Sequence, residues 1–185
     1  MGVVTAPILP PLLSCARDIE RHVAAAGWDQ PVRLFALVPT HDLRSTQPQL
    51  ASALAQDSGA GPDAEDFGDQ LSAVEQEDLP QEHSILDLLA QIGWPPGVHG
   101  AAIALERIVL PPSAQAQLPA DDGEALAAVA EHPEREDVRL LVAVLRDGSS
   151  TCLLRQRSND SDDRVALGQD IAPGLVAALE QTLSD

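Results

Sequence analysis

Hydrophobic residues along this chain follow two patterns, one with helical spacing and one of unbroken apolar runs. Residues 12–26 carry apolar side chains on one helical stripe that ends at a glycine, so they predict a helix. Apolar runs at 32–38 and 98–110, and a third that ends before Asp147, predict buried strands. A weaker alternation over 71–77 predicts an edge strand. The chain therefore mixes helices with strands.

Capping residues place the other helices. Ser, Thr and Asp side chains accept hydrogen bonds from the free N–H groups of a first helical turn, so they mark a helix start when an apolar stripe follows. The predicted helix starts are Thr46, Ser84, Asp121 and Asp170. The last of these helices carries Pro173 in its first turn and is expected to bury Leu175, Leu179 and Leu183.

The predicted elements follow the order helix, strand, helix, strand, helix, strand, helix, strand, strand, helix. We predict a single α+β domain over residues 1–185, with a five-stranded, largely antiparallel sheet and about five helices packed on it. A parallel, doubly wound sheet is the alternative, which the hairpin and the missing glycine-rich loop weaken. Residues 56–69, rich in Gly, Ala, Asp and Pro, are expected to form a mobile acidic loop.

The last two predicted strands form a hairpin. An Asp147-Gly148 turn between two apolar runs is a strong hairpin signal. With a two-residue turn, even-numbered residues of the first strand share a sheet face with odd-numbered residues of the second. Arg155 and Arg157 are then expected on the same face as Leu140, at the end of the hairpin farthest from the turn.

The charge of the chain limits its partners. Eleven arginines and no lysine face 29 acidic residues, which gives a net charge of −18 over 185 residues. A field of this sign repels phosphate backbones and anionic lipids, and the chain has no tyrosine for base stacking. We therefore expect neither nucleic acid nor a membrane as a partner, whereas a protein partner or a homodimer stays compatible with the charge. The simpler explanation of the negative charge is that it keeps the protein soluble. With two cysteines and no signal-peptide pattern, the expected location is cytoplasmic.

Polar residues gather around the end of the second hairpin strand. Two arginines precede an acidic loop, so two guanidinium groups can pair with several carboxylates. One interpretation is an ion-pair network that pins the loop, and the other is a binding site for a phosphate or carboxylate ligand. Glu106 interrupts an apolar strand and needs a partner, for which either arginine is a candidate. The candidate ligand-binding residues are Arg155, Arg157, Asp160, Asp162, Asp163 and Glu106.

The sequence lacks the common motifs for catalysis and metal binding. An EF-hand loop that begins at Asp160 needs Gly at its sixth position and Glu at its twelfth, where this chain has Val165 and Ile171. There is no nucleophile elbow, zinc-protease motif, P-loop or dinucleotide fingerprint, and the five histidines lack ligand spacing. Cys152 lies in an apolar strand, which argues against an activated thiolate. We therefore expect no catalytic residue, no metal site and no cofactor.

Three separated segments carry a family resemblance. They are HVAAAGWDQPVRLFALVPT, WPPGVHGAAIALERIVLPP and the stretch from Asp137 to Leu179, and they resemble an actinobacterial family of uncharacterised proteins. The resemblance covers nearly the whole chain and implies a cytoplasmic protein, but it carries over no functional residue. The order of strands and helices is also similar to that of type III secretion chaperones, which is an analogy of fold alone.

Two functions stay open at this point. The leading hypothesis is a non-catalytic protein-interaction or regulatory module that presents a sheet face, an edge strand or a helix groove to a partner. The alternative is a protein that binds a small anion, or an enzyme, through the cluster of arginines and aspartates at the end of the hairpin. The two hypotheses differ in whether the arginines of that cluster are free to meet a ligand.

Overall fold

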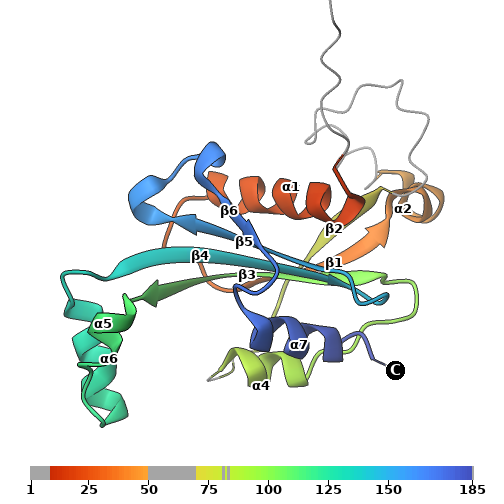
Figure 1. Ribbon diagram of the computed structural model, residues 1–185. Helices are drawn as coiled ribbons and strands as arrows, with labels where there is room; N and C mark the ends of the chain where they lie inside the picture. Colours follow the sequence, from red (N-terminus) through yellow and green to blue (C-terminus); the bar gives the residue numbers. More distant parts are fainter. Residues whose placement is uncertain (1–8, 50–69, 81, 83, 185) are drawn as a thin grey trace, which may run out of the picture.

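A six-stranded sheet carries helices on both of its faces. The computed structural model describes residues 9–49, 70–80, 82 and 84–184. The strands are β1 (Arg33–Pro39), β2 (Leu71–Gln76), β3 (Gly100–Val109), β4 (Glu136–Leu145), β5 (Ser150–Gln156) and β6 (Ala166–Gly168). The helices are α1 (Pro11–Ala25), α2 (Thr40–Thr46), α4 (Ile85–Ala90), α5 (Pro112–Gln115), α6 (Asp122–Glu131) and α7 (Pro173–Gln181). Helix α1 lies on one face of the sheet, and α4 and α7 lie on the other (Figure 1).

The sheet has the strand order β2-β1-β3-β4-β5-β6, and every neighbouring pair is antiparallel. This confirms the predicted α+β class with an antiparallel sheet and contradicts the parallel alternative. The predicted number of five strands was wrong, because the short strand β6 pairs with β5 as the sixth. The described residues also form six α-helices rather than about five. β6 has only three residues after an acidic loop, too few for its alternation to stand out in the sequence.

The predicted helix starts at Ser84 and Asp121 are correct. The side chains of Ser84 and Asp121 accept hydrogen bonds from the first turns of α4 and α6. Thr46 is the last residue of α2, and helical backbone begins again at Pro48, which agrees with the predicted short helix; the residues from 50 onward in that helix lie outside the described residues. Ala172 rather than Asp170 precedes α7. Pro173 takes the first position of α7 because its fixed φ suits that position and its missing N–H is not needed there. The predicted loop at 56–69 lies outside the described residues.

The register of the β4–β5 hairpin differs by one residue from the prediction. Leu145 N donates to Ser149 O, so three residues and not two form the loop, and Gly148 takes a left-handed φ of 86°. Leu140 therefore lies opposite Leu154, and Arg155 lies opposite Arg139. Because side chains alternate between faces, this shift moves Arg155 away from the face of Leu140.

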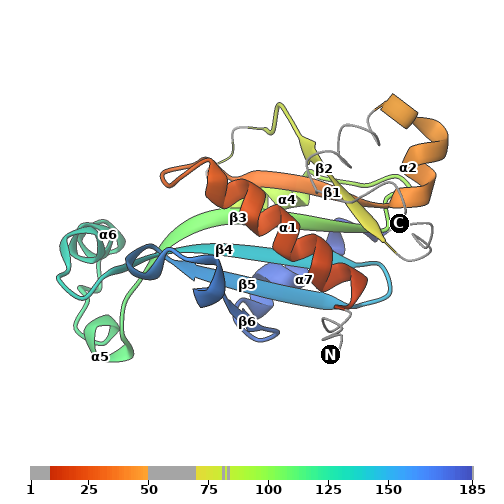
Figure 2. The ribbon, with the colours of Figure 1, turned by 90° about the horizontal axis from the view of Figure 1, so that it is seen from above.

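The core has one layer on each side of the sheet. Helix α1 runs diagonally across its face (Figure 2) and buries Ile19 and Val23 against Phe35, Leu141 and Leu153. On the opposite face, buried residues of α4, of α7 and of the segment just after α7 meet the alternate residues of β3 and β4. These residues are Leu89, Leu175, Leu179, Leu183, Ile103, Leu105, Leu140 and Val142. No helix in the described part of the chain is long and apolar enough to cross a membrane.

Candidate functional site

A row of charged side chains crosses three strands beneath the C-terminal half of α1. Glu106 on β3 lies opposite Arg139 on β4, and Arg139 lies opposite Arg155 on β5. All three lie on the α1 face, because they continue the alternation of the apolar residues that α1 covers. Two like charges directly opposite each other destabilise a sheet, so this row requires nearby carboxylates.

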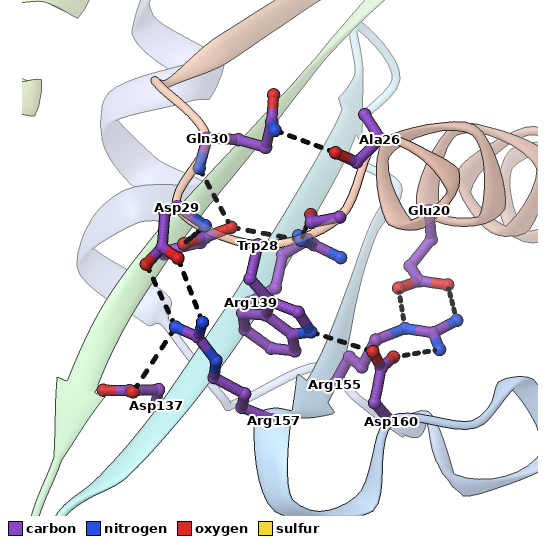
Figure 3. A network of polar contacts seen from close by, with 12 residues as sticks. Glu20, Ala26, Trp28, Asp29, Gln30, Asp137, Arg139, Arg155, Arg157 and Asp160 are labelled. Carbon is purple, nitrogen blue, oxygen red and sulfur yellow. Dashed lines mark hydrogen bonds and ion pairs between the residues drawn. The ribbon is translucent and has the colours of Figure 1, made fainter.

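Arg155 is the centre of one set of ion pairs (Figure 3). Its Nε and Nη2 donate to the two carboxylate oxygens of Glu20 on α1, at 2.6 and 2.8 Å. Nη1 donates to Asp160 at 2.9 Å, and Nη2 also donates to Asp162 at 2.5 Å. Arg155 and Glu20 are only 3% and 4% exposed. The hydrogen bonds to Glu20, followed by those to the two aspartates, raise the pKa of the Arg155 guanidinium above its already high value.

Arg139 is the centre of a second, less complete set. Its Nη2 donates to Glu106 at 3.1 Å and to the carbonyl oxygen of Gly27. The Trp28 ring lies over the Arg139 guanidinium. The guanidinium carbon is 4.4 Å from the ring centroid, a distance typical of a cation–π interaction. Within the described residues, the buried Nε and Nη1 of Arg139 have no hydrogen-bond partner. The aromatic face is thus the principal compensation for burying that half of the group.

Hydrogen bonds hold the segment between α1 and β1 against this cluster. Trp28 Nε1 donates to Asp160 at 2.9 Å, and the backbone N–H of Asp29 donates to Glu106 at 2.8 Å. Arg157 holds the Asp29 carboxylate through two hydrogen bonds of 3.0 Å. These contacts lower the pKa of Asp29, mainly through Arg157, and of Asp160, mainly through Trp28 and then Arg155. Asp29 takes a left-handed φ of 64°, so the contacts also hold a backbone conformation that costs free energy.

The structure brings only part of the predicted cluster together. Arg155, Asp160 and Asp162 are in direct contact, as the network interpretation requires. Arg157 pairs with Asp29 and approaches Asp137 at 3.7 Å, and within the described residues it forms no hydrogen bond or ion pair with the Asp160–Asp163 loop.

Glu106 and Asp163 also differ from expectation. Glu106 pairs with Arg139, so the expected pairing with Arg155 or Arg157 was wrong. The Asp163 carboxylate accepts a hydrogen bond from Ser161 and lies 4.0 Å from Arg164, away from both candidate arginines.

Four residues of the cluster were missed from the sequence: Glu20, Trp28, Asp29 and Arg139. Two of them carried a signal. Glu20 lies four positions after Ala16 and directly after Ile19, on the apolar stripe of α1, where a carboxylate needs a buried partner. Arg139 stands inside an apolar run and carried the same kind of signal. Trp28 and Asp29 follow a helix end and carried none.

The cluster has the chemistry of an ion-pair network that stabilises the fold. Arg155 directs donors to three carboxylates of the chain itself. Among the described residues, no group of three His, Cys, Asp or Glu side chains is arranged to hold a metal ion. Burial raises the pKa of the Cys15 thiol to about 12 and also raises that of Cys152, so both favour the unreactive thiol form.

Comparison with known proteins gives one family. No curated protein and no solved structure matches this chain. The model of the PPA1309-like protein family matches residues 12–184, which include every strand and helix of the two-faced sheet described above except the first residue of α1. The chain therefore belongs to the PPA1309-like protein family.

Proposed function

We propose that this protein is a non-catalytic, cytoplasmic interaction or regulatory module that binds a protein partner. The observation that carries the proposal is the state of Arg155, the most buried of the candidate ligand-binding arginines. Its donors are directed to Glu20, Asp160 and Asp162, so the cluster stabilises the fold and leaves this arginine occupied. Partner binding is then expected at other surfaces.

Two grooves beside α1 support such a role. One, of about 460 Å³, lies between α1 and strands β1 and β2, over Ile19 and Phe35. The other, of about 530 Å³, lies between the start of α1 and strands β5 and β6, and Leu13 and Leu167 are among its lining residues. Both have sizes in the range of ligand and side-chain pockets, and both adjoin a sheet edge. Open apolar hollows of this kind suit the side chains of a protein partner.

Capture from a lysate of the source organism tests the proposal. The immobilised protein should retain the same protein in repeated experiments, and that protein as bait should retain this chain in return. A partner that is attracted by the net charge of −18 should be released at about 1 M salt, where charges are screened within about 3 Å. Failure of reciprocal capture, together with a thermal shift on adding a small anion, would favour the alternative.

The alternative, an anion-binding protein, keeps one supporting observation. The buried Nε and Nη1 of Arg139 have no hydrogen-bond partner in the described residues, and the Trp28 ring lies over the guanidinium. Movement of Trp28 would open two donors to a carboxylate or phosphate. Phosphate or a dicarboxylate should then raise the melting temperature of the wild type and leave that of Arg139→Met unchanged.

A further inference from the structure

We propose that the outer edge of β2, together with the groove between β2 and α1, binds an extended segment of a partner protein as a seventh, antiparallel strand. This inference rests on the proposed interaction function and names its site. β2 ends the sheet on one side, and no strand in the described part of the chain pairs with its outer edge. An unpaired edge of this kind is a template for an added strand, in which backbone hydrogen bonds provide affinity and alternate side chains provide specificity.

The backbone groups that face outward from β2 can be assigned. Thr40 N donates to Gln70 O at 2.8 Å, so the residues of β2 that bond to β1 are the even-numbered ones. Pro39, which has no N–H, stands opposite Leu71 and agrees with this alternation. Leu71, Ala73 and Glu75 therefore direct their N–H and C=O groups away from the sheet. A partner strand of five or so residues would meet three donors and three acceptors.

The same three residues line the groove with their side chains. Leu71, Ala73 and Glu75 form one wall of the 460 Å³ hollow, and Ile19 and Phe35 lie among its other lining residues. Residues directly opposite in an antiparallel pair point to the same face, so partner side chains opposite these three would enter the groove. Ala73 is small, which leaves the centre of the groove free for an apolar side chain above Ile19 and Phe35.

Charge selects the occupant. A second copy of this chain would bring two charges of −18 together, which disfavours self-pairing at this edge. Glu75, Glu77 and Asp78 are exposed at the C-terminal end of β2, and Arg33 pairs with only the first of them among the described residues. An antiparallel partner strand places its N-terminal end beside Glu77 and Asp78. The occupant is therefore a segment that begins with basic residues and continues with alternating apolar residues.

Peptide binding tests this proposal by fluorescence anisotropy. The probe is a labelled peptide with two N-terminal arginines followed by alternating threonine and valine; its matched control carries two glutamates in place of the arginines. The wild-type chain should bind the arginine peptide at least about tenfold more tightly than the glutamate peptide at low salt, and this ratio should shrink as salt rises.

Two substitutions of one residue separate the edge from the groove. Ala73→Pro removes the central outward N–H, a change that edge strands tolerate, and Ala73→Phe fills the groove but keeps the N–H. Each should weaken binding of the arginine peptide by about tenfold or more. Ala177→Phe, the same change at an exposed alanine of α7, should leave binding unchanged. Far-UV circular dichroism and melting curves verify that each variant is folded, and either Ala73 variant suffices for the test.

Three results would overturn the proposal. They are no binding of the arginine peptide by the wild type, equal binding by wild type and both Ala73 variants, and a dimer of the wild type that Ala73→Pro converts to a monomer. If the peptide does not bind but reciprocal capture succeeds with wild type and Ala73→Phe alike, the edge assignment fails and the interaction function stands. If capture fails as well, both fail.

Discussion

The buried pair of Glu20 and Arg155 provides the sharpest test of the structural role assigned to the cluster. We consider Glu20→Leu, Arg155→Met and the double variant, each of which replaces a charged group by an apolar one of similar length. Both side chains are almost fully buried and joined by two hydrogen bonds. Removing one partner of such a pair leaves the other charge without compensation, whereas removing both does not.

The expected losses of unfolding free energy differ between the two single variants. In Arg155→Met the Glu20 carboxylate stays buried with no cation, and the cost is about 3–5 kcal/mol. In Glu20→Leu the arginine keeps Asp160 and Asp162, which are partly exposed, so the cost is about 1–3 kcal/mol. The double variant should lie within about 1 kcal/mol of the wild type, because an apolar pair replaces an ion pair with a large desolvation cost.

Urea unfolding measures these differences. Far-UV circular dichroism and tryptophan fluorescence should give coincident transitions, which verifies that a free energy can be extracted. For a chain of this size each kcal/mol corresponds to about 2–4 °C in melting temperature, so Arg155→Met should melt about 6–20 °C below the wild type. The reasoning is refuted if Arg155→Met costs less than about 1 kcal/mol, or if the double variant is as unstable as the sum of the single variants.

Four further predictions address other features of the structure. Arg157→Ala should leave the melting temperature unchanged within error, because Arg157 and its partner Asp29 are 42% and 76% exposed; a clear drop would show a buried role. The folded-state pKa values of Asp29 and Asp160 are lowered, so their stabilisation is complete above about pH 4 and is lost as pH falls through the folded values; acid melting curves should show this, and Asp160→Asn should flatten the decline. A thiol reagent at pH 8 should label Cys15 and Cys152 only after unfolding, and rapid labelling of the native protein would contradict their burial. Gel-shift assays at about 150 mM salt should show no binding of DNA or RNA, and micromolar retention would contradict the charge argument.

The sequence by itself determined the elements whose signals are local. The apolar stripe of α1, the buried runs of β1, β3 and β4, and the caps Ser84 and Asp121 were all predicted within a few residues of their observed positions. Each of these signals involves residues within about four positions of one another, so no knowledge of distant segments is needed. The antiparallel α+β class followed from the same signals, because a hairpin combined with helices and further strands argues against a fully parallel sheet.

Only the tertiary structure decided which residues of the cluster meet. One extra loop residue at Gly148 changed the hairpin register and moved Arg155 to the α1 face, where Glu20 lies 135 positions away in sequence. Arg157 likewise found Asp29 at a separation of 128 positions instead of the neighbouring aspartates. Any arginine can pair with any carboxylate, so side-chain chemistry does not select among them. The choice depends on which side chains the packed helix and the sheet register bring within hydrogen-bonding distance.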